Sequence, residues 1–290
     1  MYVDTLTLKI IFKKGTRTFM KKQLAIFIDS FDDYKDVWPA FFNIFNRYWL
    51  DCKYKKYLSC NKCDFHYKDL KILKTGKEID WYTRTIKSLE MIEEDYVLFL
   101  LEDYFFSKTI KNEEIDQIVE YMTENNVFYY QLSSVDLKGN SYIVNIDNID
   151  KIDYPISLQI AIWNKKFFLN ELHNMYKIGA KTPWDFEKYY IQLKQENPNY
   201  LINIMKNVRY DNRDLFGYKN GILQGQWIPK TVKFYEKKGI NIDTSKRKKM
   251  SLRRSFMYDI KVFLSKHMSK EIKQKSKKYL KYLGIKFMID

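Results

Sequence analysis

The order of hydrophobic and polar stretches along the chain predicts short buried strands separated by helices. Leu24–Ile28 and Val97–Leu101 are continuous apolar runs that end directly in polar or acidic residues, a pattern typical of strands covered on both faces of a sheet. Shorter or more mixed stretches predict four further strands, at Leu6–Phe12, Tyr54–Leu58, Val127–Leu132 and Ile156–Trp163.

Helical periodicity appears between these strands, with recognisable start signals. Asp36 with Pro39 predicts the beginning of one helix, and Asp80 is a suitable N-cap for the next. Asn112–Asn125 reads as a helix, another begins near Lys166, and Thr182 followed by Pro183 begins a further one. Alternating strands and helices predict an α/β fold with a mostly parallel central sheet flanked by helices.

Charge divides the chain into two parts. The net charge is +15, but residues 246–290 contain 15 Lys and Arg against three acids, a net of +12. The rest of the chain is nearly neutral. We therefore expect one globular domain over residues 1–245 and a basic amphipathic helical extension over residues 246–290.

The extension mixes cation clusters with apolar residues, which is typical of a helix on an anionic membrane surface. A solvated helix face packed on the body is the simpler alternative, and nucleic acid is the least favoured partner because no recognition module is apparent. No apolar stretch reaches the ~18 to 20 residues that span a bilayer, and no signal peptide is recognisable. We expect a cytoplasmic protein, peripheral at the inner face of the cell membrane.

Three cysteines give no disulfide framework. Cys60-x-x-Cys63-x-x-His66 resembles half of a zinc site, but a fourth ligand at matching spacing is missing unless Cys52 supplies it. We expect reduced, partly buried thiols.

Glu102 and Asp103 follow the strand Val97–Leu101 directly. Carboxylates at such a place cost several kcal/mol unless a cation or a hydrogen-bond donor compensates them. Open α/β sheets bind ligands beyond the carboxyl ends of their strands. The pair therefore predicts a divalent metal or a phosphorylated ligand, with a local ion pair as the alternative. The phosphate loop, the dinucleotide glycine fingerprint and the serine nucleophile elbow are absent.

Taken in order, six short segments resemble the GT-A glycosyltransferases of bacterial capsule, O-antigen and related surface-polysaccharide synthesis. The likeness covers roughly residues 22–230 and depends on the order and spacing of these motifs. The segments are Phe27–Asp33, Asp36–Trp38, Trp81–Arg84, Leu101–Phe105, Ser157–Trp163 and Pro183–Glu187.

The resemblance implies a GT-A-like domain whose donor is a nucleotide-diphosphate sugar. Ser30 and Asp32 would face the nucleotide, and Arg84 would approach the diphosphate. Glu102 and Asp103 occupy the place of the metal-binding Asp-x-Asp motif, but Leu101 stands where that motif has its first acid. Asp103 is then the expected ligand of Mn or Mg or of the donor sugar, with Glu102 in support, and metal dependence stays open.

The same resemblance places the acceptor side around the later segments. Asp185 or Glu187 would take the proton of the acceptor hydroxyl; we rank Asp185 first because it lies nearer the start of its helix. A capping role for Asp185 is the alternative, since the helix dipole favours acids there. Ser157, Gln159 and Trp184 are the expected acceptor or sugar contacts.

The sequence thus favours a glycosyltransferase of the hexosyltransferase type. It would move a sugar, from UDP as the commonest donor nucleotide of the resembled class, to a glycan or lipid-linked acceptor. The alternatives are a metal-dependent nucleic-acid-binding protein or enzyme that uses the basic tail for phosphate contacts, and a non-catalytic membrane-surface scaffold.

Overall fold

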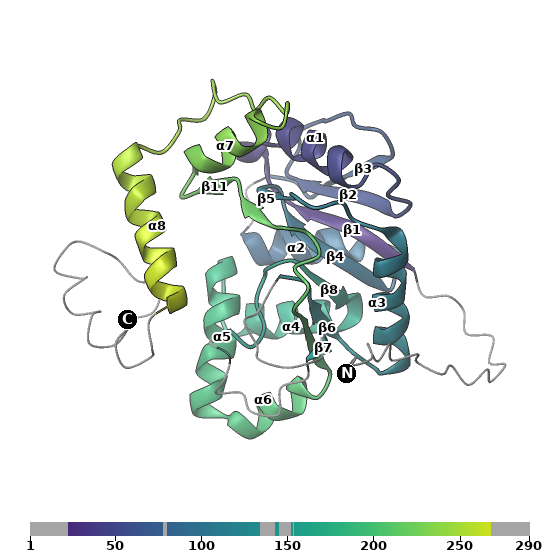
Figure 1. Cartoon of the computed structure of the whole chain (residues 1–290). Coiled ribbons are helices and arrows are strands. Elements are labelled where there is room, and N and C mark those ends of the chain that lie inside the picture. The colour runs from purple at the N-terminus through teal and green to yellow at the C-terminus, as the bar shows by residue number, and fades with distance from the viewer. Residues whose placement is uncertain (1–22, 78–79, 134–142, 145–151, 153, 268–290) are drawn as a thin grey trace, which may run out of the picture.

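A computed structural model describes residues 23–77, 80–133, 143–144, 152 and 154–267 (Figure 1). The predicted strand Leu6–Phe12 and the end of the basic extension, residues 268–290, lie outside the described residues.

A sheet of eight strands forms the centre of the described part of the chain. Its strand order is β3-β2-β1-β4-β8-β6-β9-β7, and every strand except β8 and β7 runs in the same direction. The strands are β1 Leu24–Asp29, β2 Lys55–Cys60, β3 Leu70–Lys74, β4 Tyr96–Leu101, β6 Tyr129–Gln131, β7 Ile143–Val144, β8 Ala161–Asn164 and β9 Val208–Asp211. The predicted mostly parallel α/β sheet is confirmed.

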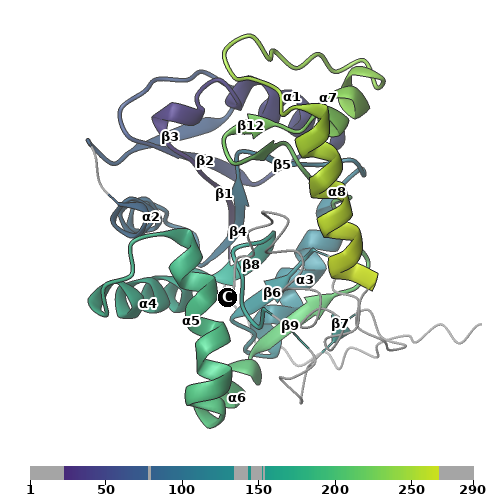
Figure 2. The same ribbon diagram turned by 90° about the vertical axis from the view of Figure 1, so that its left-hand side faces the viewer.

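Helices cover both faces of this sheet (Figure 2). Side chains of β1 alternate between two cores: Ile26 and Ile28 pack with helix α1, and Ala25 and Phe27 pack with helices α2, α4 and α5. The helices are α1 Trp38–Tyr48, α2 Trp81–Glu90, α3 Asn112–Glu124, α4 Lys165–Lys177, α5 Pro183–Glu196, α6 Pro198–Met205, α7 Pro229–Glu236 and α8 Leu252–His267. Each fully buried Ile or Phe contributes about 1.5–3 kcal/mol to folding.

Of the three helix N-caps that the sequence predicts, two are confirmed and one is wrong. Asp80 caps α2 by accepting from the Thr83 N–H, and Thr182 begins α5 in a capping box. Helix α1 begins instead at Trp38 with Val37 as its N-cap. Asp36 was wrongly assigned as that cap, because its carboxylate binds Arg247, 211 residues later in the chain.

One strand was predicted too long, and another strand was not predicted. Only the end of Ile156–Trp163 forms a strand, since β8 begins at Ala161 and the residues before it turn and bend. Strand β3 was missed because its sequence, Leu70-Lys-Ile-Leu-Lys74, is half exposed at the edge of the sheet and carries two lysines.

Two small antiparallel ladders lie beside the end of β4. Strand β5 (Tyr104–Phe105) pairs with β10 (Lys219–Asn220), and β11 (Ile222–Leu223) pairs with β12 (Gln226–Trp227). Gly221 joins the ladders, and a Cβ there would lie 2.6 Å from the Phe105 ring. The glycine-rich segment is therefore a tightly packed hairpin, with Gln224 and Gly225 both at positive φ.

The start of the basic extension is attached to this hairpin. The backbone N–H of Trp227 donates to the Lys248 carbonyl at 3.0 Å, and the Trp227 carbonyl accepts from the Met250 N–H at 2.9 Å. Helix α8 follows, where Arg254 donates to Gln226 at 2.9 Å. The division at 245/246 stays a prediction, but residues 247–250 contact the body directly.

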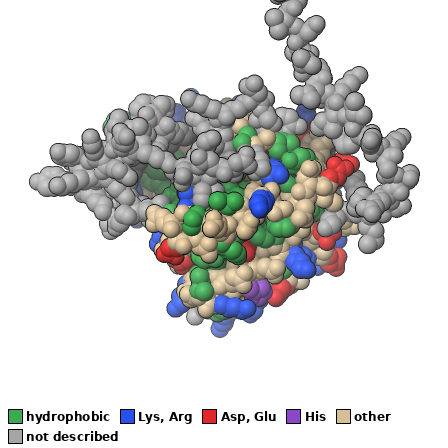
Figure 3. Space-filling model, turned by 90° about the horizontal axis from the view of Figure 1, so that it is seen from below, with side chains coloured by type: hydrophobic (Ala, Val, Ile, Leu, Met, Phe, Trp, Pro, Cys, Tyr) green, Lys and Arg blue, Asp and Glu red, His purple; other side chains and the backbone are tan. Residues whose placement is uncertain are grey.

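Among the described residues, no helix is both long and apolar enough to cross a membrane. Large hydrophobic side chains that are exposed occur singly or in small groups, and the face seen from below shows such groups between charged and polar side chains (Figure 3). Scattered exposure of this kind is ordinary for a protein surface.

Candidate functional site

The carboxyl ends of β1 and β4 meet where the chain reverses its direction across the sheet. From β1 the chain proceeds through α1 to β2 and β3 on one side, while β4 returns to pair with β1 on the other. Such a switch point opens a crevice between neighbouring strands, and α/β proteins bind ligands there. Asp29 and Ser30 end β1 on this edge, and Glu102 and Asp103 end β4.

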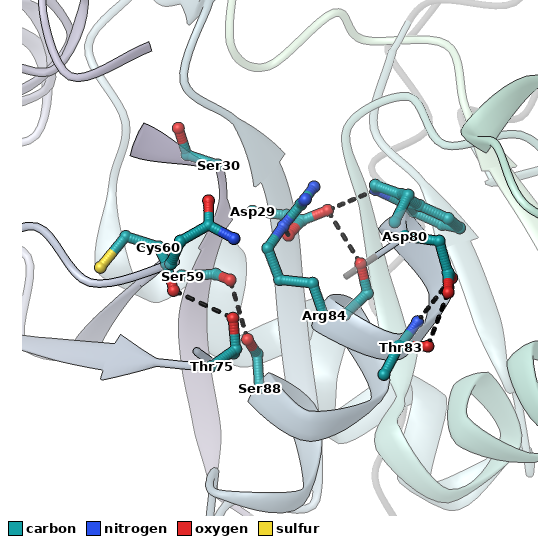
Figure 4. A network of polar contacts seen from close by, with 12 residues as sticks. Asp29, Ser30, Ser59, Cys60, Thr75, Asp80, Thr83, Arg84 and Ser88 are labelled. Carbon is teal, nitrogen blue, oxygen red and sulfur yellow. Dashed lines mark hydrogen bonds and ion pairs between the residues drawn. The ribbon is translucent and has the colours of Figure 1, made fainter. Parts of the chain in front are cut away.

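Asp29 is fully buried at the end of β1 and faces α2 (Figure 4). Its carboxylate accepts from Trp81 Nε1 at 2.6 Å and from the Thr85 hydroxyl at 3.1 Å. Burial raises the pKa of Asp29, while Arg84 and the two hydrogen bonds oppose that rise. The sequence had not singled out Asp29, although the alternation that buries Phe27 against α2 puts Asp29 on the same side.

Arg84 lies between Asp29 and the ring of Phe31. Its side chain is 10% exposed, its Nε is 3.8 Å from Asp29 Oδ1, and its guanidinium carbon is 5.2 Å from the Phe31 ring centroid. Neither Arg84 Nε nor Asp29 Oδ1 has a hydrogen-bond partner within the described residues. A buried cation with unused donors beside a strand end is suited to binding an anion.

Ser30 faces the opposite side of the sheet from Asp29 and connects α1 to the acidic pair. Its Oγ accepts from Trp38 Nε1 at 2.8 Å, and its hydroxyl is near enough to Glu102 to oppose the rise in the pKa of that carboxyl. Glu102 is 6% exposed. Burial and the neighbouring negative charge of Asp103 raise the pKa of Glu102 well above its ordinary value.

Asp103 lies with Glu102 in the turn between β4 and β5, so strand geometry does not force the two side chains apart. The Asp103 carbonyl accepts from the Gly221 N–H at 2.8 Å. Burial raises the pKa of Asp103, and the Ile222 N–H and the charge of Arg247 partly offset that rise. Two acids with raised pKa values at one strand end mark a candidate binding site.

Asp32 binds the backbone of the cysteine loop, and its predicted contact with a nucleotide stays a prediction. Its carboxylate accepts from the backbone N–H groups of Asn61, Lys62 and Cys63, the shortest at 2.9 Å. Burial alone would raise the pKa of Asp32, but these hydrogen bonds outweigh it and lower the pKa. Asp32 therefore holds the cysteine loop in place, and its oxygens are already used by local donors.

The cysteine loop shows thiols and no metal-type cluster. Cys52, Cys60 and Cys63 are all free, and Cys60 Sγ contacts the Cys63 carbonyl at 3.3 Å. Within the described ranges, no three His, Cys, Asp or Glu side chains gather as metal ligands would.

The expected acceptor contacts divide into buried and exposed groups. Ser157 is buried, and its carbonyl accepts from the Tyr129 hydroxyl at 3.2 Å. Gln159 is exposed and accepts from the Ser133 hydroxyl at 2.8 Å. Trp184 is 55% exposed at the start of α5.

The two acids in the first turns of α5 have opposite surroundings. Asp185 completes the capping box, accepting from the Thr182 N–H at 2.8 Å and the Lys181 N–H at 3.1 Å. Although slight burial opposes it, these bonds lower the pKa of Asp185. Asp185 thus makes the capping contacts of its alternative interpretation, and its ranking as the first base stays a prediction.

Glu187 points inward from α5. Its carboxylate accepts from the Leu158 N–H at 3.2 Å, and the Leu158 carbonyl accepts from the Tyr104 hydroxyl at 3.1 Å. Burial raises the pKa of Glu187, partly offset by the Leu158 hydrogen bond. Because Tyr104 directly follows Asp103, this chain of contacts links Glu187 to the acidic pair.

The acidic pair fits a divalent cation only when substrate oxygens and water complete the coordination shell of the metal. Magnesium in phosphate-binding sites takes one or two carboxylates from the protein and completes its shell with substrate oxygens and water. Glu102 is buried and Asp103 is partly buried, both have raised pKa values, and a bound cation would stabilise their ionised forms. These two residues would hold such a cation together with a diphosphate.

Comparisons with known proteins give distant structural similarity. No protein family and no curated protein sequence matches the chain. Residues 1–349 of TarS from S. aureus match at a TM-score of 0.39 and 12% identity over 68% of this chain. The galactosyltransferase LgtC, solved with donor and acceptor sugar analogs, matches at 0.36 and 9% over 65% of this chain and 87% of its own.

A mycobacterial protein of solved structure is similar to the same degree, at a TM-score of 0.40 and 7% identity, covering 70% of this chain and 68% of its own. The chain spans 59% of the TarS fragment's length. Since these TM-scores lie below 0.5 and the identities below 25%, what these proteins do is not carried over to this chain.

Proposed function

We propose that this protein is a glycosyltransferase that moves a sugar from a nucleotide-diphosphate donor to a glycan or lipid-linked acceptor. The observation that carries the proposal is the sheet edge at which β1 and β4 end, where buried Arg84 keeps unused donors and two acids with raised pKa values follow β4. A nucleotide sugar presents phosphate oxygens and hydroxyls that such groups can bind.

On the donor side, Arg84 approaches the diphosphate and Asp103 contacts the donor sugar or a metal. Glu102, held by Ser30, supports Asp103. A divalent cation at the pair would neutralise charge that develops on the leaving diphosphate. Asp32 acts indirectly, by fixing the loop of residues 61–63 beside the crevice.

For the chemical step, Glu187 is the base. Its carboxylate accepts the proton of the acceptor hydroxyl while that oxygen bonds to the anomeric carbon of the donor sugar. The bond from that carbon to the diphosphate oxygen breaks, and the nucleotide diphosphate leaves with the electron pair. A raised pKa brings Glu187 nearer to neutral pH, where a general base is most effective.

A role in bacterial surface-polysaccharide synthesis, next to the inner face of the membrane, fits helix α8. Leu252 and Phe256 lie one helical turn apart and are 82% and 63% exposed, and Arg253 between them is also exposed. Apolar and cationic side chains together favour an anionic lipid surface. UDP is proposed as the donor nucleotide because it is the commonest in the resembled class.

A panel of nucleotide sugars tests the proposal, with and without manganese. A donor that binds the folded state raises its melting temperature, and incubation with acceptor should release the free nucleotide. Asp103→Asn is the matched variant and should lose both responses. No thermal shift and no nucleotide release for any donor would reject the proposal.

The nucleic-acid alternative has its own readout. Salt-sensitive binding of DNA or RNA, without any nucleotide-sugar binding, would favour it. Several cations of the extension already have protein partners, among them Arg247 with Asp36 and Arg254 with Gln226. The described part of the extension therefore gives that alternative no support.

A further inference from the structure

Arg247, at the start of the basic extension, joins two segments of the body. Its Nε and Nη2 donate to both oxygens of Asp36 at 2.9 and 2.8 Å, and Nη2 also donates to the Asp33 carbonyl at 2.6 Å. Its Nη1 donates to the Gly225 carbonyl at 3.1 Å, and its guanidinium carbon is 4.3 Å from the Tyr34 ring centroid. We refer to these contacts as the Arg247 clasp.

The Arg247 clasp is largely shielded from solvent. The side chains of Arg247 and Asp36 are only 13% and 14% exposed. A forked, two-point pair of this kind needs a planar guanidinium, which lysine does not offer. The backbone around Arg247 is also fixed, because Lys248 and Met250 pair with Trp227.

The first of the two segments that the Arg247 clasp joins lies next to Glu102. Asp33 and Asp36 belong to the loop between β1 and α1, which begins with Ser30. Ser30 accepts from Trp38 at the start of α1, and its hydroxyl is near enough to Glu102 to oppose the rise in the pKa of that carboxyl. Movement of this loop would therefore move the hydroxyl that Glu102 depends on.

The second segment lies next to Asp103. Gly225 lies in the turn of the β11–β12 hairpin, and the base of that hairpin holds Asp103 at two points. Gly221 donates its N–H to the Asp103 carbonyl at 2.8 Å, and the N–H of Ile222 is near enough to the Asp103 carboxylate to offset part of the rise in its pKa. Each acid is thus held by one of the two segments that Arg247 joins.

We propose that Arg247 is a positioning residue for the candidate donor site: by clasping the loop after β1 to the β11–β12 hairpin, it fixes Glu102 and Asp103 relative to each other. The contacts of the Arg247 clasp do not depend on any reaction, whereas the expected effect of the clasp on donor binding rests on the proposed function. The basic extension then has a second task besides contact with a membrane, because its first residues help to build the site.

Hydrogen exchange tests the clasp without any ligand. Arg247→Lys keeps the charge and loses the fork, so we expect faster exchange both in residues 30–38 and in residues 220–226. Arg253→Lys, at an exposed arginine six residues later, is the matched control and should exchange like the unaltered protein. Asp36→Asn provides a second route if Arg247→Lys does not fold. Unchanged exchange, or a change confined to one of the two segments, would overturn the proposal.

Kinetics then test the consequence for the site. With Arg247→Lys we expect kcat/KM for the donor to fall about tenfold to a hundredfold, since small misplacements of site groups have effects of that size. The donor KM should rise while the acceptor KM stays constant. Full activity in Arg247→Lys would show that charge alone suffices and would overturn the positioning role. If both segments exchange faster but the unaltered protein binds no nucleotide sugar, the clasp stands and the proposed function fails.

Discussion

The turn after β4 and the first turns of α5 each carry two acids close together, and they differ in how those acids are hydrogen-bonded. Glu102 is buried and Asp103 is partly buried, and both have raised pKa values and few local donors. Asp185 has three local donors and a lowered pKa, whereas Glu187 has one backbone donor and a raised pKa. The comparison teaches that local hydrogen-bond donors, more than position on an element, decide which acid remains available to a ligand.

The largest expected effect is at the turn after β4. Asp103→Asn keeps the size of the side chain but removes the charge that would face the donor or its metal. We expect nucleotide-sugar turnover to fall by about 10²- to 10³-fold, the usual loss when one electrostatic group of an active site is removed. Steady-state nucleotide release measures it. Activity within a few fold of the unaltered protein would remove this turn from the proposed site.

The next effect separates the two acids of α5. Glu187→Gln should lower kcat by about 100-fold, as expected for loss of a general base. Asp185→Asn should leave kcat within about twofold, since Asp185 is occupied by its capping contacts. The opposite ranking would restore Asp185 as the base.

A smaller effect is expected at the exposed start of α5. Trp184→Ala should raise the acceptor KM about fivefold, because the stacking of an indole on a sugar is worth about 1 kcal/mol. The melting temperature should stay unchanged because the side chain is 55% exposed. Equal KM values for both proteins would exclude Trp184 from the acceptor site.

The smallest expected effects are changes in melting temperature. Their dependence on pH should be opposite for Glu187→Gln and Asp185→Asn. Glu187 has a raised pKa, so folding favours its protonated form; stability it contributes below pH 4.5 is lost as pH rises through the folded pKa. Glu187→Gln should therefore have a higher melting temperature than the unaltered protein at pH 8 and lose that advantage at pH 4.

Asp185 has a lowered pKa, so its stabilisation is present above pH 3.8 and is lost as pH falls through the folded pKa. Asp185→Asn should cost about 0.3–1.5 kcal/mol at neutral pH, the usual range for a capping contact. The cost should shrink below pH 4. Thermal unfolding of both variants at pH 3.5, 4, 6 and 8 measures the two trends, and parallel trends would contradict the assignment.

Local signals in the sequence were sufficient for much of the fold. The apolar runs of β1 and β4 and the caps Asp80 and Thr182 were predicted because each depends on neighbouring residues alone. The acidic pair was found for the same reason, since it follows a buried strand directly.

What the sequence missed depends on contacts between distant segments. Asp36 resembles a helix cap locally, but its partner Arg247 lies 211 residues away. Asp32 resembles a ligand-facing acid until the loop of residues 61–63 folds against it. Asp29 becomes prominent only once α2 brings Trp81 and Arg84 to the end of β1.

The indole groups at the end of β1 have a practical consequence. Trp38 donates its N–H to Ser30 on one side of the sheet, and Trp81 donates to Asp29 on the other. Tryptophan emission responds to hydrogen bonding and nearby charge, so the end of β1 has a built-in fluorophore on each side of the sheet. Comparison of Trp38→Phe and Trp81→Phe would show from which side of the sheet a ligand signal comes, with no label attached to the protein.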